Sequence, residues 1–153
     1  GGAAIDVFPE EPRANGDPFT SPLATLDNVI LTPHIGGSTE EAQYDIGRFV
    51  AAKIGEYQAS GSTDMSVNLP NLTMNIGKRS RYRVRLIHRN VPGVMARVNQ
   101  IFASSEANVD AQILATMDEV GYVLTDISAG LGREALEELS HLPETIRLIA
   151  TPL

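Results

Sequence analysis

The sequence predicts a mixed chain, with an α/β segment first, a linking helix next, and an α+β module of order β-α-β-β-α-β at the end. Three observations lead to this prediction. Two short apolar runs near the N-terminus each end in a loop that is rich in proline or glycine. A longer segment then carries apolar residues at helical spacing. From residue 78 onward, alternating and helical apolar patterns follow one another.

The composition excludes several classes of protein. Hydrophobic residues make up 42% of the 153 residues, which is enough for an ordinary core. No apolar run approaches the roughly 18 residues that a membrane helix needs. The chain has no cysteine, which excludes disulfides and thiolate metal sites, and we expect a cytoplasmic protein without a metal. The net charge of -7 argues against a dedicated nucleic-acid binder, because phosphate contacts need clustered cations.

The first segment places an acid and a histidine at the ends of two predicted strands. Residues 3–8 and 28–31 are short apolar runs of the kind that form buried strands. Glu11 follows the first strand between two prolines, and His34 follows the second directly after Pro33. Taken alone, such a histidine is more often structural than catalytic. An acid on the neighbouring strand end favours a histidine acid/base pair that is held in one tautomer.

The next predicted element is a helix over residues 38 to about 58. Ser38 followed by Glu41 forms a capping box, which predicts Ser38 as the N-cap. Apolar residues recur at helical spacing on one face, namely Ala42, Ile46, Phe49, Val50 and Ile54. Small and polar residues then end the helix, and the chain to about residue 77 is predicted to be a linker.

The last part of the chain, residues 78–153, has the pattern of a separate module. Four strands are predicted from alternating apolar positions, at residues 83–88, 109–115, 122–128 and 145–150. Two helices are predicted from one-sided apolar spacing, with Val94, Val98, Ile101 and Phe102 inward in the first and Leu131, Ala135, Leu136, Leu139 and Leu142 inward in the second. The order β-α-β-β-α-β is that of the ferredoxin-like split unit.

A basic stretch opens this module. Seven of the twelve lysine and arginine residues lie between Lys78 and Arg97. Four arginines alternate and would share one face of a strand, namely Arg79, Arg81, Arg83 and Arg85. A solvated strand face is the simpler interpretation, and a surface that attracts anions is the alternative.

The first segment resembles the end of the coenzyme domain in the D-2-hydroxyacid dehydrogenases. Two motifs carry the resemblance, F-P-x-E-P with Glu11 and P-H-[IV]-G-[GA] with His34. The resemblance implies that Glu11 pairs with His34, which exchanges a proton with the substrate hydroxyl while hydride moves to or from NAD. It also implies that Asp6 contacts the nicotinamide and that the backbone of Gly36 and Gly37 lines the same pocket. One branch of this family oxidises 3-phosphoglycerate, which is the substrate that we expect.

The expected extent of the chain follows from a motif that the sequence lacks. No G-x-G-x-x-G occurs, so the pyrophosphate-binding turn of a Rossmann-type domain is not present. We therefore expect the C-terminal part of a longer dehydrogenase, inactive by itself. The expected sections are residues 1–37, a C-terminal remnant of the NAD-binding domain, residues 38–76, a helix and linker that return to the substrate domain, and residues 77–153, a regulatory domain.

The loop after the first strand of the module is a candidate ligand site. His88, Asn90 and Gly93 precede a helix start, where free N–H groups favour a carboxylate. Turn-forming and capping roles would also explain these residues. The pattern H-x-N-x-P-G-[VI] resembles the ligand loop of an ACT domain, a module that binds amino acids in metabolic enzymes. The resemblance implies that His88 and Asn90, with Asn108 before the second strand, bind L-serine between two such domains of a homo-oligomer. We expect the module to pair through its sheet edges or helices, with the edge of the first strand and the ligand loop facing a symmetric partner.

Two functions of different class remain open. The chain is either a segment of an NAD-dependent dehydrogenase that carries an acid/base pair and a serine-binding regulatory domain, or an amino-acid-binding module without catalysis. A dehydrogenase with another acid substrate is a third possibility, and the serine-type ligand loop argues against it.

Overall fold

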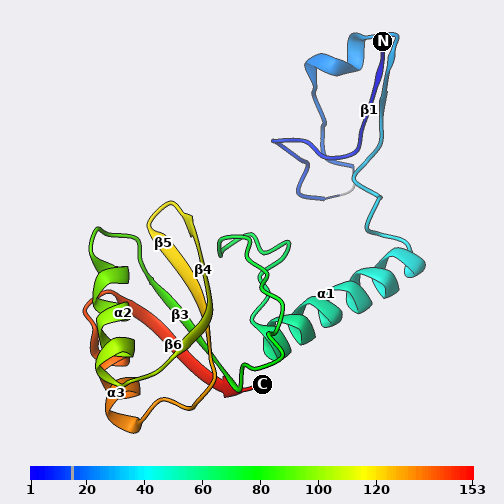
Figure 1. The fold of residues 1–153 in the computed structure, drawn as a ribbon. Coiled ribbons are helices and arrows are strands. Elements are labelled where there is room, and N and C mark those ends of the chain that lie inside the picture. The colour runs from blue at the N-terminus through cyan, green and yellow to red at the C-terminus, as the bar shows by residue number, and fades with distance from the viewer. Residues whose placement is uncertain (15) are drawn as a thin grey trace. The chain divides into compact units, whose positions relative to one another are not determined.

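The chain folds into two compact units, Gly1–Ala52 and Lys53–Leu153 (Figure 1). The structure is a computed structural model that describes residues 1–14 and 16–153. None of the helices in these ranges is long and apolar enough to cross a membrane. The predicted mixture of an α/β segment and an α+β module is confirmed. The division into three sections by origin stays a prediction.

The first unit is built on two short parallel strands. Strand β1 is Ala3–Ile5 and strand β2 is Val29–Leu31, both shorter than predicted. A single turn of 3-10 helix, Pro22–Thr25, precedes β2. Because the strands are parallel, their carboxyl ends lie at the same edge. This pairing brings Asp6, just after β1, next to Thr32, just after β2, with 2.6 Å between carboxylate and hydroxyl oxygen.

Helix α1, Glu40–Ser60, follows the loop after β2. Its N-cap is Thr39, whose Oγ1 accepts a hydrogen bond from the backbone N–H of Ala42 at 3.1 Å. The capping box predicted at Ser38 is therefore wrong by one residue. The Ser38 hydroxyl instead donates to the carbonyl of His34 at 3.5 Å. The predicted apolar face of α1 is about half exposed at Ile46, Phe49, Val50 and Ile54.

The second unit contains a four-stranded antiparallel sheet in the order β4-β5-β3-β6. Its elements in chain order are β3 (Tyr82–Arg89), α2 (Val94–Ser104), β4 (Val109–Met117), β5 (Val120–Ile127), α3 (Arg133–His141) and β6 (Thr145–Pro152). This is the predicted ferredoxin-like βαββαβ order. Helix α2 starts at Val94 and not at Pro92, because Gly93 before it adopts a left-handed conformation with φ 89°.

Helices α2 and α3 cover one face of this sheet (Figure 1). The core between them contains Val84, Leu86, Val94, Val98, Ile101, Phe102, Val123, Ile127, Ala135 and Leu139, all at most 6% exposed. The inward residues predicted for α2 are all in this set. In α3, Ala135 and Leu139 are buried, and Leu131 and Leu142 pack at the margin.

The opposite face of the sheet is covered by the linker between α1 and β3. Leu72 of the linker forms a second core with Tyr122 and Leu124 of β5, and Tyr57 and Met74 pack against it. The Tyr122 hydroxyl donates to the carbonyl of Gly61 at 2.7 Å. Burial raises the pKa of this phenol well above its ordinary value. The linker is thus part of the second unit and covers Tyr122 and Leu124 on the sheet face that α2 and α3 leave open.

Arg83 joins the linker to the sheet. Its guanidinium makes a bidentate pair with Asp126 of β5, with N–O distances of 2.6 and 2.8 Å, and both side chains are at most 1% exposed. It also donates to the carbonyls of Ser60 at 2.6 Å and Met74 at 2.9 Å. These carbonyls lie at the two ends of the linker, so a single side chain closes the loop between them.

Arg85 makes a similar contact one pleat further along β3. Its Nη1 donates to the carbonyl of Tyr57 in the last turn of α1 at 2.7 Å, and its guanidinium lies 5.7 Å from the Tyr57 ring centroid. Arg83 is 1% exposed and Arg85 6%. For these two residues both sequence interpretations, a solvated face and an anion-attracting surface, are wrong. Alternation placed them on one face correctly, but the linker covers that face.

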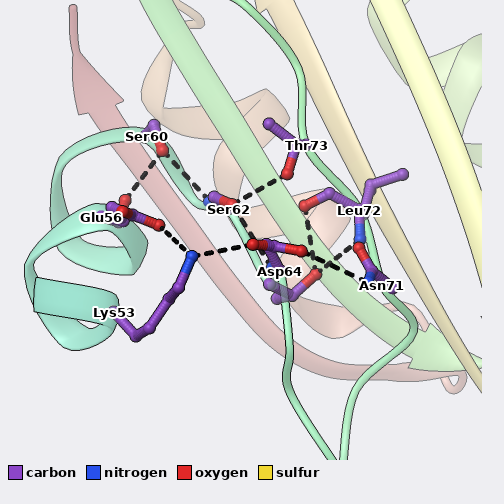
Figure 2. Close-up of polar contacts among 9 residues, drawn as sticks. Lys53, Glu56, Ser60, Ser62, Asp64, Asn71, Leu72 and Thr73 are labelled. Carbon is purple, nitrogen blue, oxygen red and sulfur yellow. Dashed lines mark hydrogen bonds and ion pairs between the residues drawn. The ribbon is translucent and has the colours of Figure 1, made fainter. Parts of the chain in front are cut away.

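Polar side chains hold the linker in its path, as Figure 2 shows. Lys53 of α1 contacts Asp64 at 2.7 Å and Glu56 at 3.0 Å. The hydroxyls of Ser62 and Thr73 lie 2.9 Å apart and join the two limbs of the linker. The hydrogen bond from Lys53 holds the pKa of the Asp64 carboxyl below its usual value and raises the pKa of Lys53.

Removal of Arg83 alone should destabilise the second unit strongly. Arg83→Met leaves the Asp126 carboxylate buried without its partner, and we expect a loss of about 3–5 kcal/mol in urea unfolding followed by circular dichroism. The double variant Arg83→Met/Asp126→Leu should recover a large part of this loss, because it leaves no unpaired charge. Arg133→Met, which breaks the exposed pair with Glu137, is the control and should cost under about 0.5 kcal/mol. A single variant as stable as this control would contradict the assignment.

Candidate functional site

The first unit brings the predicted acid and histidine together. The Nδ1 atom of His34 lies 2.7 Å from Oε2 of Glu11. The other carboxylate oxygen of Glu11 accepts the backbone N–H of Phe8 at 2.9 Å, which fixes the carboxylate. Because a carboxylate accepts hydrogen bonds, Nδ1 of His34 carries the proton. The neutral ring then has its lone pair at Nε2, the atom that can exchange a proton.

The backbone directs His34 out of its loop. His34 adopts a left-handed conformation with φ 53°, which is uncommon for a residue with a side chain. Pro33 before it disfavours helical geometry at Thr32 and ends β2. The imidazole is 52% exposed as a result, and strain of this kind is often found at functional positions.

The contact between the two side chains shifts both pKa values. The hydrogen bond from His34 lowers the pKa of Glu11, and the same hydrogen bond raises the pKa of His34. Each group therefore favours its charged form in the presence of the other. The charged pair is complete in the pH range between the lowered pKa of Glu11 and the raised pKa of His34. Its contribution to stability is lost above that range as His34 deprotonates, and below it as Glu11 is protonated.

Asp6 anchors the loop that carries His34. Its carboxylate accepts hydrogen bonds from the Thr32 hydroxyl at 2.6 Å and from the backbone N–H groups of Ile35 at 3.0 Å and Gly36 at 2.9 Å. These bonds, that of Thr32 first, lower the pKa of Asp6. A side chain at Gly36 would start 3.0 Å from this carboxylate, so glycine permits the close approach. The role of Thr32 could not be recognised from the sequence, because it depends on strand pairing.

A cavity of about 590 Å³ lies beside the pair in the first unit. Its described lining includes Phe8, Glu11, Pro12, Arg13, Ala14, Gly16, Asp17, Phe19, Leu31, Thr32, Pro33 and His34. The rings of Phe8 and Phe19 meet edge to face there, with centroids 4.7 Å apart. Asp6, Gly36 and Gly37 are not among these residues, and their predicted contact with the coenzyme stays a prediction.

The candidate effector residue His88 is buried at the end of β3. It is 2% exposed, and its Nδ1 donates to the carbonyl of Arg89 at 2.9 Å. Its Nε2 has no hydrogen-bond partner in the described part of the chain. The ring lies against Gly121 of β5, where an added Cβ would overlap it. Gly121, which sequence reasoning missed, therefore makes room for the imidazole.

The other two candidate effector residues lie at opposite ends of the sheet. The Asn90 side-chain amide donates to the carbonyl of Asp118 at 3.1 Å, in the turn that joins β4 to β5. Asn108 precedes β4 and donates to Asp110 at 3.0 Å. The strand register places the start of β4 next to the start of β3, because Val109 and Tyr82 both pair with Ile127. The eight residues of β3 span about 25 Å, so Asn108 cannot join His88 and Asn90 within one copy.

The edges of the sheet are β4 and β6. Sequence reasoning expected the first strand of the module, now β3, to offer an edge for pairing. That expectation is wrong, because β3 is hydrogen-bonded to β5 on one side and to β6 on the other. Strand β4 is free on its outer side and begins directly after Asn108.

Sequence comparison finds a match to one known family in each of the two units. Residues 1–36 match the D-isomer specific 2-hydroxyacid dehydrogenase, NAD binding domain, and residues 84–147 match the AHAS small subunit-like ACT domain. The first match lies within the first unit, and the second match lies within the second unit. The expected resemblance to both families is confirmed, and the second match includes residues from all four strands of the second unit.

Several proteins are similar to this chain over nearly its whole length. The D-3-phosphoglycerate dehydrogenase of Escherichia coli strain K12 is 50% identical over 149 residues, which are 95% of this chain and 36% of that protein. The proteins of the same name from Haemophilus influenzae and Dictyostelium discoideum are 46% and 43% identical, each over 95% of this chain and 35% of the relative. The chain therefore spans about a third of the length of the relatives that it matches.

The His34–Glu11 contact can be checked by titration. In Glu11→Gln the raised pKa of His34 should fall toward its ordinary value, because the amide cannot supply the charge of the carboxylate. NMR of the imidazole C–H signals against pH measures this midpoint. Glu10→Gln, one residue away, is the matched control and should leave the midpoint in place. An unchanged midpoint in Glu11→Gln would contradict the pairing.

Proposed function

We propose that this chain is the C-terminal part of an NAD-dependent D-3-phosphoglycerate dehydrogenase, an oxidoreductase of L-serine biosynthesis that is inhibited by L-serine. The observation that carries the proposal is the His34–Glu11 contact beside a cavity, in a chain 50% identical to the Escherichia coli enzyme. Residues 1–37 would belong to the NAD-binding domain, 38–76 would return the chain toward the substrate domain, and 77–153 would form the regulatory domain.

In this proposal His34 exchanges a proton with the substrate. Nε2 of the neutral ring takes the proton of the hydroxyl as 3-phosphoglycerate is oxidised, and the imidazolium returns it in the reverse reaction. Glu11 keeps Nδ1 protonated and lowers the free energy of the imidazolium, because its charge lies next to the ring. The raised pKa of His34 agrees with this role, since a stronger base accepts a proton more readily.

The residues at the strand ends fit a nicotinamide coenzyme. NAD, when bound, accepts the hydride from the substrate carbon. A carboxylate can accept about four hydrogen bonds, and that of Asp6 accepts three within the protein. About one position is left to accept a hydrogen bond from the coenzyme carboxamide. The loop of Gly36 and Gly37 would let the coenzyme approach the backbone. In this role Asp6 binds the coenzyme and also positions the His34 loop.

Substitutions in the complete enzyme test the catalytic pair. His34→Ala should lower kcat by about two to four orders of magnitude, the range that general acid–base catalysis supplies. Glu11→Gln should move the pH at which activity is half-maximal downward, because the His34 pKa falls. Turnover in His34→Ala equal to that of the unaltered enzyme would contradict the proposal. Glu10→Gln is again the matched control.

The proposed effector site is shared by two copies of the second unit. If two β4 edges pair antiparallel across a twofold axis near their middle, the start of one β4 lies beside the end of the other. Asn108 of one copy then comes next to the turn that contacts Asn90 of the other. The unpaired Nε2 of buried His88 would gain a partner from the ligand, which recovers about 1–3 kcal/mol.

Mixed dimers test whether the serine site is shared. Asn90→Ala and Asn108→Ala should each weaken L-serine binding roughly tenfold or more in calorimetry. Refolded together, the two variants should regain tight binding at one of the two sites of each mixed dimer, which contains one intact combination of Asn90 and Asn108, and thus at about a quarter of all sites when the copies pair at random. No recovery on mixing would contradict a site between two copies. Asn99→Ala, on the exposed side of α2, is the control and should bind serine normally.

An isolated amino-acid-binding module without catalysis is the second candidate function. The compact second unit, with a core on each face of its sheet, favours it. An assay of the 153-residue chain itself can exclude the second candidate but not the first. NAD-dependent oxidation of 3-phosphoglycerate by this chain would exclude the binding module, whereas serine binding without turnover agrees with both.

A further inference from the structure

The Thr32 hydroxyl is a donor that the proposed mechanism does not use. Thr32 follows β2, and its backbone N–H donates to the carbonyl of Ile5 at 3.0 Å, which carries the β1–β2 pairing one residue beyond Leu31. The pairing sets the half-buried side chain beside Asp6, where the hydroxyl donates to Oδ1 at 2.6 Å. This distance is typical of a hydrogen bond to a charged oxygen, which is roughly twice as strong as one between neutral groups.

The two oxygens of the Asp6 carboxylate are used unequally. Oδ1 accepts from the Thr32 hydroxyl and from the backbone N–H of Ile35 at 3.0 Å. Oδ2 accepts from the backbone N–H of Gly36 at 2.9 Å and from no other residue in the described part of the chain. Each carboxylate oxygen offers about two accepting positions. Thr32 therefore completes Oδ1, and the position that stays free is on Oδ2.

Gly36 leaves the approach to Oδ2 uncovered. A Cβ at this residue would lie 3.0 Å from Oδ2, so any side chain there would stand against the oxygen that has the free position. Gly36 itself is exposed. A glycine at such a place lets a ligand come close to the backbone and to the groups beside it. The free position on Oδ2 is thus accessible as well as unused.

Thr32 differs from the other two donors in what it is attached to. Ile35 and Gly36 belong to the exposed loop after β2, and their N–H groups move with that loop. Thr32 belongs to the strand end, where its main chain is tied to Ile5. Its hydroxyl is therefore the donor that ties the Asp6 carboxylate to the paired strands. Loss of this bond would free the carboxylate to turn and would open a second accepting position on Oδ1.

We propose that Thr32 is a positioning residue for the nicotinamide coenzyme, because its hydroxyl fixes the Asp6 carboxylate so that Oδ2 is the oxygen that accepts the carboxamide N–H. This inference rests on the proposed function, which assigns Asp6 to the coenzyme, and adds the residue that orients Asp6. The hydrogen bond from Thr32 also lowers the pKa of Asp6, so the carboxylate stays charged and can only accept.

Coenzyme binding by the complete enzyme tests the inference. Thr32→Val keeps the shape of the side chain and removes the donor, and it should bind NADH about tenfold more weakly in a fluorescence titration. The kcat for 3-phosphoglycerate should stay within about twofold, because the bonds that hold the His34 loop remain. Thr32→Ser keeps the donor and should bind NADH normally. Thr25→Val is the control, since its hydroxyl donates to the carbonyl of Pro22 at an exposed site.

The 153-residue chain offers a test that needs no coenzyme. Carbon-13 NMR of the Asp6 carboxyl against pH should show a higher pKa in Thr32→Val than in the unaltered chain, because the strongest of its hydrogen bonds is lost. Thr32→Ser and Thr32→Ala form a second pair that differs by the hydroxyl alone. This pair decides the question if Thr32→Val does not fold, and the pKa of Asp6 should be higher in Thr32→Ala than in Thr32→Ser.

The outcomes separate this inference from the proposed function. Equal NADH affinity in Thr32→Val and the unaltered enzyme would contradict the inference alone. A loss in Thr32→Ser as large as that in Thr32→Ala would also contradict it, because the effect would then come from packing. A fall in kcat at unchanged NADH affinity would do the same, since Thr32 would then act on the His34 loop. If the unaltered complete enzyme binds no NADH, the proposed function is wrong and the inference falls with it.

Discussion

The second unit depends on the buried pair of Arg83 and Asp126. Two charges with almost no solvent contact are tolerable only when nearly every donor and acceptor is used, and here the guanidinium binds both carboxylate oxygens and carbonyls at the two ends of the linker. The linker is therefore fixed on the sheet face that the helices leave open. The free hydrogen-bonding positions for another copy lie at the sheet edges, β4 and β6, because each inner strand is paired on both sides.

His34 and His88 have the same ring hydrogen bonding in different surroundings. In His34 and His88 alike, Nδ1 donates to an oxygen and leaves Nε2 as the available nitrogen. The partner of His34 is a charged carboxylate beside an open cavity, so its pKa rises and a proton can be exchanged with solvent or substrate. The partner of His88 is a neutral carbonyl, and the ring is enclosed against Gly121. Charge and exposure therefore distinguish the proposed acid/base role of His34 from the proposed binding role of His88.

The length of the sheet explains why the proposed effector site needs two copies. His88 and Asn90 lie at the end of β3, whereas Asn108 lies beside its start, and the strand between them is too long for one ligand to bridge. A ligand that contacts residues from both ends of the sheet therefore links two subunits, and its binding favours their association.

The sequence by itself determined the order of elements, the helix-side core and the His34–Glu11 pair, because each depends on local periodicity or on a short motif. The capping box was predicted at Ser38, one residue before the N-cap that the structure has. Strand β3 was wrongly predicted to be an edge strand, because no local sequence pattern determines the order of strands in a sheet. Alternation placed Arg83 and Arg85 on one face, yet only the tertiary structure decided that the face is buried. The cause is the distant linker, whose carbonyls and whose Leu72 cover that face, and contacts between residues so far apart along the chain leave no periodic signal in the sequence.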